Sequence, residues 1–222
     1  NEEKAAGPKM AQKAALNGLA SVAYMLGSHE QSLQYFNQCL MVDEKDEACL
    51  KNRVLAYLQL GKPGNALSDA IKLTEEYPLS IEYKYFLAAS FYQLKNGEAA
   101  LHQLQEIASR TLDNQQVMHL LGLVLLKKKA YLNSLFFLKQ SNVLLPDTIE
   151  YQLALAAAYY KNSQPTLTEE ILGNIFNSHS LINIIKTIQQ NDYLDSETLR
   201  FIENRLASMI KNNPVHHEPI TL

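Results

Sequence analysis

The stretch YPLSIEYKYFLAASFYQL, residues 77–94, returns later in the chain as LPDTIEYQLALAAAYYKN, residues 145–162. The two stretches share an Ile-Glu-Tyr triplet and a proline close to the start, and they begin 68 residues apart. Both the apolar pattern and the position of the proline are therefore repeated. Self-similarity at a fixed interval is typical of repeat proteins.

The underlying period is 34 residues, half of that interval. Three positions of the repeat show this 34-residue period: two of them hold leucine, and the third holds a small side chain. These series are Leu33, Leu67, Leu101 and Leu135; Leu19, Leu87, Leu121 and Leu155; and Ser32, Ala66, Ala100 and Ser134. Gly27 and Gly61 are also one period apart. Small residues at a fixed place in the repeat indicate points where two helices approach closely.

Each 34-residue unit has the pattern of two amphipathic helices. In the third unit, apolar residues follow helical spacing from Tyr85 to Tyr92, a Lys-Asn-Gly sequence at 95–97 interrupts them, and a second apolar stripe begins at Ala100. The unit is therefore predicted to be a helical hairpin.

The repeated stretch marks the junction between one hairpin and the next. Pro78 and Pro146 are predicted to end the preceding helix, because proline lacks an amide proton and disfavours helical geometry in the residue before it. Ser80 and Thr148 are predicted to cap the following helix, and a glutamate stands two residues after each of them, where the helix dipole favours negative charge.

In these features the sequence resembles the tetratricopeptide repeats, a family of 34-residue helix-turn-helix units that carry small residues at the helix crossings and often end in proline. The Leu-Gly pair at 121–122 fits the family motif. The resemblance implies an all-α fold, a right-handed superhelical solenoid of helical hairpins. Its five units are placed at 13–46, 47–80, 81–114, 115–148 and 149–182, the last of them degenerate.

Three other segments flank this array from 13 to 182. Residues 1–12 form an N-terminal segment without an assigned structure. Residues 183–212 are predicted to form C-terminal capping helices, one of them begun by Asp195, because the last unit of a solenoid needs its open apolar face covered. Residues 213–222 contain two prolines and no periodicity, and are predicted to be a disordered tail.

Composition limits the partners and the compartment. The 222 residues include 20 basic and 23 acidic side chains, which makes nucleic acid a poor candidate partner. No run is long and apolar enough to cross a bilayer, and the start NEEKAAGPKM is too polar for a secretory signal. We expect a soluble cytoplasmic protein, or a periplasmic one if a signal was removed upstream of Asn1. Cys39 and Cys49 are expected to be buried thiols, with a single disulfide as the alternative.

The sequence contains no recognisable catalytic or metal site. Its six histidines include no pair at the spacing that binds zinc on a helix, and neither a glycine-rich phosphate loop nor a nucleophile motif is present. We therefore expect no enzyme activity, no cofactor and no bound metal.

The resemblance implies that partners bind on the inner surface of the solenoid, which the first helix of each unit lines. The implied inward residues are Asn17, Ser21 and Tyr24; Lys51, Leu55 and Leu58; Tyr85, Ala89 and Tyr92; His119, Leu123 and Leu126; and Leu153, Ala157 and Tyr160. Family members that grip a terminal carboxylate present several lysines, arginines and asparagines together, whereas here Lys51 stands nearly alone. The predicted groove is apolar and edged with tyrosine.

The groove predicts a protein partner that offers apolar segments. Tyr85, Tyr92 and Leu123 are the residues on which this prediction rests, although tyrosines at equivalent positions also serve as packing between units. The resemblance implies a protein–protein interaction scaffold, either an adaptor or chaperone in bacterial secretion or surface-appendage assembly, or a regulatory module of a longer protein, for example the sensor or effector part of a transcription regulator.

Overall fold

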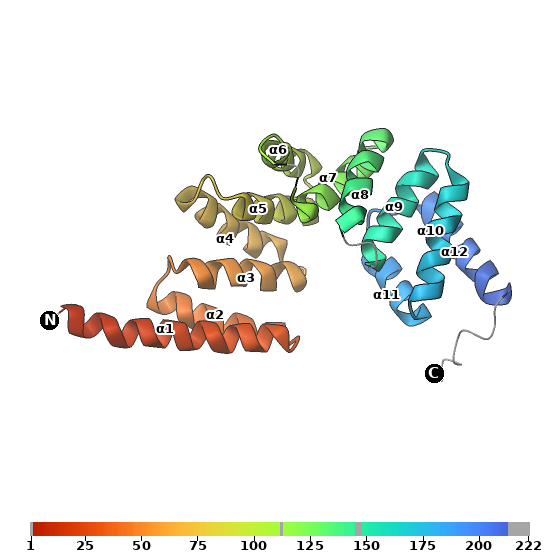
Figure 1. Ribbon diagram of the computed structural model, residues 1–222. Coiled ribbons are helices and arrows are strands. Elements are labelled where there is room, and N and C mark those ends of the chain that lie inside the picture. The colour runs from red at the N-terminus through yellow and green to blue at the C-terminus, as the bar shows by residue number, and fades with distance from the viewer. Residues whose placement is uncertain (1, 112, 145–147, 213–222) are drawn as a thin grey trace. The chain divides into compact units, whose positions relative to one another are not determined.

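The computed structural model describes residues 2–111, 113–144 and 148–212, and over these residues it contains helices and no strand (Figure 1). Ten helices form five consecutive hairpins, and two more follow. The hairpins are α1 (Glu2–Met25) with α2 (His29–Val42), α3 (Glu47–Gln59) with α4 (Pro63–Glu76), α5 (Ile81–Gln93) with α6 (Gly97–Ala108), α7 (Gln115–Lys127) with α8 (Tyr131–Leu144), and α9 (Ile149–Lys161) with α10 (Pro165–Ser178). The last two helices of the described residues are α11 (Leu181–Gln190) and α12 (Ser196–Asn212). The predicted all-α solenoid of helical hairpins is confirmed.

The described helices fall into two compact units. Unit 1 is Asn1–Arg110, with α1 to α6, and unit 2 is Thr111–Leu222, with α7 to α12. Within unit 1 each helix packs on the next in chain order, as Figure 1 shows. Within unit 2 the same order holds from α7 to α10, and both α11 and α12 contact α9 and α10. None of the described helices combines the length and the apolar character needed to cross a lipid bilayer.

The hairpin turns repeat one backbone conformation every 34 residues. Gly27 and Gly61 adopt φ angles of 76° and 62°, in the left-handed region. Lys95, Lys129 and Ser163 adopt the same conformation at the equivalent positions, with φ angles of 62°, 61° and 57°. This conformation costs a non-glycine residue free energy. The sequence period is therefore also a backbone period, and it is kept even where glycine is absent.

The first helix of a unit begins with a side-chain cap at the same interval. Asp46, Ser80 and Asn114 each accept a hydrogen bond from the amide three residues later, at 2.9, 3.3 and 3.1 Å. The cap predicted at Ser80 is confirmed. Thr148 occupies the N-cap of α9, but its side chain makes no capping hydrogen bond, so the cap predicted there is wrong. Pro146, predicted to end α8, lies outside the described residues.

Small residues occupy the crossings between the two helices of a hairpin. Ser32, Ala66, Ala100, Ser134 and Thr168 follow one another at the 34-residue interval and are all fully buried. At the crossing of α7 with α8, Gly122 faces Leu138, and a Cβ atom on residue 122 would lie 2.5 Å from Leu138 Cγ. The hydroxyl of Ser134 donates to the Gly122 carbonyl at 2.8 Å. The two helices thus meet too closely for any larger side chain.

The C-terminal helices cap unit 2. Ile184 and Ile188 of α11 and Ile202 and Leu206 of α12 share a buried cluster with Leu153 of α9. The Asp195 carboxylate accepts a hydrogen bond from the Thr198 amide at 2.9 Å, which confirms the predicted start of α12. α11 begins at Leu181, two residues before the predicted boundary, and the predicted tail 213–222 lies outside the described residues.

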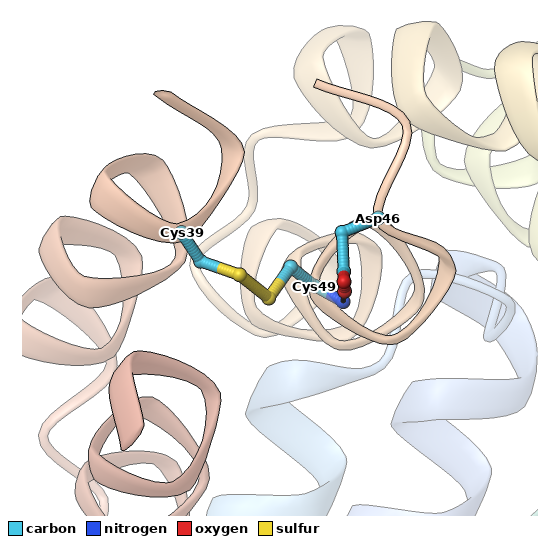
Figure 2. Close-up of side chains that lie close together, drawn as sticks. All are labelled: Cys39, Asp46 and Cys49. Atoms are coloured by element: carbon cyan, nitrogen blue, oxygen red, sulfur yellow. Dashed lines mark hydrogen bonds between the residues drawn. A yellow bond between two sulfur atoms is a disulfide. The ribbon is translucent and has the colours of Figure 1, made fainter. Parts of the chain in front are cut away.

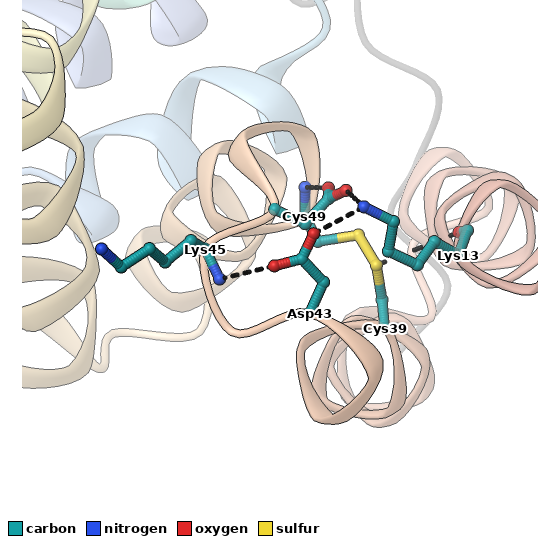
Figure 3. Close-up of polar contacts among 6 residues, drawn as sticks. Lys13, Cys39, Asp43, Lys45 and Cys49 are labelled. Carbon is teal, nitrogen blue, oxygen red and sulfur yellow. Dashed lines mark hydrogen bonds and ion pairs between the residues drawn. A yellow bond between two sulfur atoms is a disulfide. The ribbon is translucent and has the colours of Figure 1, made fainter. Parts of the chain in front are cut away.

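A disulfide joins the first two hairpins. Cys39 of α2 is bonded to Cys49 of α3 (Figure 2), so the expectation of two free thiols is wrong. Beside it, the Lys13 ammonium of α1 lies 2.6 Å from Asp43 and 2.9 Å from Asp46 (Figure 3). The hydrogen bonds that Lys13 donates to the two carboxylates raise the pKa of Lys13, which keeps it charged. One covalent bond and two ion pairs therefore fix α1, α2 and α3 together.

Candidate functional site

The first helices of unit 1 present the predicted inward residues side by side. α3 contacts both α1 and α5, and polar side chains bridge these contacts. Asn52 donates to Asn17 at 3.2 Å, and Gln93 donates to the Leu58 carbonyl at 3.3 Å. We call the resulting surface the first-helix face. It consists of Asn17, Ser21, Tyr24, Lys51, Leu55, Leu58, Tyr85, Ala89 and Tyr92.

Each residue of the first-helix face is half-buried. Tyr24, Leu55, Leu58 and Tyr85 pack on the buried core of unit 1 while part of each side chain remains accessible. Partial burial also raises the pKa of the Tyr24 phenol, so its hydroxyl stays neutral and can donate a hydrogen bond. The core therefore holds these apolar and aromatic side chains in place while part of each remains accessible.

Charge on the first-helix face is neutralised within the protein. The Lys51 ammonium lies 2.8 Å from the Glu82 carboxylate of α5, and the Ser21 hydroxyl donates to the Asn17 carbonyl at 2.8 Å. A site that grips a carboxylate needs several donors without such partners. The geometry therefore favours an apolar segment over a terminal carboxylate, in agreement with the sequence.

The equivalent residues of unit 2 are placed differently. Five of the six predicted inward residues are buried: His119, Leu123, Leu126, Leu153 and Ala157, with exposed fractions of 6%, 4%, 6%, 0% and 1%. The His119 ring stacks on Tyr151 at 3.9 Å between centroids. The structure therefore places these side chains in the interior of unit 2, and they do not form an accessible surface.

The amino-acid sequence of α7 indicates that this helix is buried. α7 is apolar around its whole circumference, and every residue from Val117 to Leu126 is buried. A helix that is apolar on all sides is typically enclosed by other helices. By contrast, α3 carries polar residues among its apolar ones and lies half-exposed.

Tyr160 serves the C-terminal cap of unit 2. Its ring stacks on Phe201 of α12 at 4.3 Å, and its hydroxyl donates to Glu197 at 3.3 Å. The adjacent Lys161 pairs with Asp195 and with Glu197, each at 2.7 Å. In this arrangement Tyr160 and Lys161 attach α12 to α9.

Comparison with known proteins agrees with the helical hairpins. The sequence matches no protein-family model and no curated protein sequence. Among solved structures, a tetratricopeptide repeat protein from Parabacteroides merdae is 17% identical with a TM-score of 0.68, over 94% of this chain and 80% of that chain. TTC0263, a thermophilic tetratricopeptide repeat protein from Thermus thermophilus, is 18% identical with a TM-score of 0.66, over 88% and 99%.

The chain has the tetratricopeptide repeat fold. A structure of Pseudomonas aeruginosa pilF shares the fold as well, with 16% identity and a TM-score of 0.67 over 94% of this chain and 95% of that chain. These identities are low, so the likeness concerns the fold. The particular surface used by this tetratricopeptide array has to be argued from its own side chains.

One group of side chains in the described part of this tetratricopeptide array has the composition of a metal site. It consists of Cys39, Asp46 and Cys49 (Figure 2). The two sulfur atoms are bonded to each other, which removes the thiolates that a metal would bind. The Asp46 carboxylate already accepts from the Cys49 amide and pairs with Lys13. The group is therefore a structural link between helices.

Unit 1 also contains a small pocket that the sequence did not indicate. Its volume is about 210 Å³, and it is lined by Glu44, Lys45, Leu50, Lys72, Leu73, Glu75, Glu76 and Tyr77. These residues come from α3, the end of α4 and the α2–α3 connection, so no local motif could reveal it. Ligand pockets usually measure about 300–1,000 Å³, which makes this one small for an organic ligand.

Proposed function

We propose that the protein is an interaction scaffold that binds an apolar segment of another protein on the first-helix face of unit 1. The observation that carries this proposal is that the face is half-buried throughout: Tyr24, Tyr85, Leu55 and Leu58 pack on the core beneath and yet remain partly accessible. Side chains that are already ordered lose little conformational entropy when a partner covers them. The proposal describes a binding protein and assigns it no catalytic activity.

The partner segment is apolar, and either extended or helical. Tyrosine combines a large apolar ring with a hydroxyl that can pair with backbone groups of the segment. Lys51 and Glu82 neutralise each other at the edge of the face, so the segment needs no particular charge. Aromatic residues of this kind are enriched among those that contribute most to binding.

The disulfide supports an oxidising compartment for this function, for example the periplasm. Structural disulfides persist outside the reducing cytosol. Cys39 and Cys49 are both fully buried, so the bond lies inside the core of unit 1. We propose on this basis that the scaffold acts in secretion or in the assembly of surface structures. Thiol titration of the unfolded protein isolated from its native cells tests the compartment, and two free thiols would contradict it.

A library of displayed peptides provides the binding test. Peptides selected on the protein are measured against Tyr85→Ala, Tyr92→Ala and Leu55→Ala by calorimetry. We expect an affinity loss of about tenfold or more for at least one tyrosine variant, because truncated aromatic anchors often cost 2 kcal/mol or more.

Met41→Ala is the matched control, because Met41 lies in unit 1 but on α2 and is 85% exposed. Its affinity is expected to equal that of the unchanged protein. Thermal melts of all four variants separate lost binding from lost folding. Normal affinity in all three folded variants of the first-helix face would contradict the proposed function.

A further inference from the structure

The outer side of α1 carries an apolar stripe without a partner in the described structure. The stripe consists of Ala11, Ala15, Gly18, Leu19 and Val22 of α1 and of Leu26, the first residue after the helix, all exposed. The exposed fractions of Leu19, Val22 and Leu26 are 52%, 53% and 76%. None of the exposed residues from 10 to 26 is charged. The stripe is about 22 Å long at 1.5 Å per residue, and an uncharged surface of this length marks an interaction site.

The repeat shows what covers such a stripe in the other hairpins of unit 1. Val22 is equivalent to Ala56 in α3 and to Ser90 in α5, one and two periods later. Both equivalents are fully buried, whereas Val22 is 53% exposed. α3 packs on α2 and α5 packs on α4. The face that is open on α1 is thus the face that a neighbouring helix covers on α3.

Two contacts of α3 confirm that this face meets a helix. Cys49, the equivalent of Ala15, is bonded to Cys39 of α2. Arg53, the equivalent of Leu19, donates to an asparagine of α2 at 2.8 Å. The equivalent residues of α1, Ala15 and Leu19, are both apolar. By comparison with α3, a helix that offers apolar side chains fits the stripe.

We propose that this helix is α1 of a second copy of the chain, and that the two α1 helices pack antiparallel about a two-fold axis. The sizes of the side chains along the stripe support this choice. The first half of the stripe holds small residues, and the second half holds large ones. In an antiparallel pair centred between residues 18 and 19, Ala11 meets Leu26 and Ala15 meets Val22 of the other copy.

The centre of the stripe also suits a two-fold axis. Residues next to such an axis lie close to their own counterparts in the second copy, so a charged residue there would be repelled by its counterpart. The central residues are Gly18 and Leu19, and a Cβ on Gly18 would have no atom within 4 Å. Gly18 therefore leaves room for the Leu19 side chain of the second copy. None of the residues of the stripe belongs to the first-helix face, so the dimer leaves the proposed binding surface accessible.

Sedimentation equilibrium of the whole protein tests the dimer. We expect a reversible dimer that Val22→Glu weakens by about tenfold or more, because each copy then buries an unpaired glutamate against the apolar Ala15 of the other copy. Met41→Glu introduces the same charge at another exposed apolar residue of unit 1 and is expected to leave the dimer unchanged. Circular dichroism and thermal melts establish that both variants are folded.

A mixing experiment tests the antiparallel register. Ala15→Lys and Val22→Glu should each weaken self-association, since each places like charges in the interface. When the two variants are mixed, the lysine introduced in one copy faces the glutamate introduced in the other, and the second pair of the interface stays apolar. The mixture should therefore form a heterodimer.

Three results would overturn the proposal. The first is that the unchanged protein remains monomeric up to about 0.5 mM, since self-association would then be too weak to form the proposed dimer. A dimer could form that folded Val22→Glu does not weaken. A dimer could also be weakened by both variants and not restored on mixing, which would exclude the antiparallel pairing.

Discussion

At the scale of single residues, Gly122 marks a close contact between α7 and α8. The neighbouring Leu138 is fully buried and cannot move aside into solvent. Glycine is a poor helix former, by about 1 kcal/mol relative to alanine. At this position the missing side chain outweighs that cost, because α8 occupies the space.

Gly122→Ala is therefore expected to lower the free energy of unfolding by about 1–3 kcal/mol, through overpacking against Leu138. Gly122→Leu should destabilise at least as much. The matched control is Gly173→Ala in α10, where a Cβ would meet no atom within 4 Å, and where helix propensity should raise stability by about 0.5–1 kcal/mol. Urea unfolding measures both. If Gly122→Ala raised the free energy of unfolding, the close contact between α7 and α8 at this residue would be contradicted.

The left-handed turn residues give a second prediction. Lys129→Gly and Ser163→Gly should each stabilise the protein by about 0.5–1 kcal/mol, because glycine adopts this conformation without the steric cost of a Cβ. Gly61→Ala at the equivalent turn should destabilise by about 1 kcal/mol. Thermal unfolding checks all three. Equal stabilities of Lys129→Gly and the unchanged protein would mean that the turn is relaxed with either residue.

Single residues also show where sequence reasoning stops. The caps at Ser80 and Asp195 were predicted, because a cap depends on neighbours only three residues away. The disulfide was only the alternative to two buried thiols, since the choice depends on how α2 and α3 are juxtaposed in space. Thr148 has the residue type and the position of a cap, but its side chain does not make the hydrogen bond.

At the scale of helices, the disulfide links the first two hairpins covalently. It joins residues ten apart in sequence, and closing a loop of this size stabilises a protein by about 2–3 kcal/mol in the chain-entropy model. A reducing agent should lower the free energy of unfolding by that amount. The Cys39→Ala/Cys49→Ala variant should be insensitive to the reducing agent, and an unchanged protein that is equally insensitive would contradict the bond.

The link between α9 and α12 predicts a dependence on pH. Partial burial raises the pKa of Asp195, but hydrogen bonds from Lys161 and Thr198 outweigh burial and lower the pKa to about 2. Because the folded pKa lies below the ordinary value of 3.8, the stabilisation is present above pH 4 and is lost as the pH falls towards 2. The carboxylate is about half-exposed, so the loss should be below about 1 kcal/mol.

Asp195→Asn isolates this charge, since asparagine can still cap α12. Thermal melts between pH 5 and pH 2 should show a smaller loss of stability in the variant than in the unchanged protein. Parallel curves for the two proteins would mean that the Lys161 pair contributes nothing to folding.

At the scale of the molecule, the period predicted the hairpins because each contact in a solenoid joins units next to each other in sequence. The period did not predict which of the first helices remain accessible. Leu123 and Leu55 occupy equivalent positions two periods apart, yet Leu123 is 4% exposed and Leu55 is half-buried. The exposed fractions of Leu123 and Leu55 differ because the residues surrounding α7 and α3 differ. The inward positions alone carry no information about those surroundings.

Unit 1 contains a buried cluster of its own, so we expect it to fold alone. Phe36, Val54 and Leu73 lie in a buried cluster formed by residues of α1 to α5. We expect a fragment of residues 1–110 to be helical and to unfold cooperatively, with a midpoint that falls when the disulfide is reduced. A fragment that lacks a cooperative transition would show that unit 1 depends on unit 2 for its stability.

The regular spacing of the left-handed turns has a genetic consequence. Duplication of the 34 codons for residues 47–80 would place Ser80 before a second Glu47, where Asp46 stands now, and would add a turn at the same interval as all the others. Each junction would again hold a capping residue followed by a first helix. An insertion of 33 or 35 codons would instead shift every later cap and crossing out of phase. The gene can thus gain or lose whole units of 34 codons while the contacts within and between neighbouring hairpins are kept.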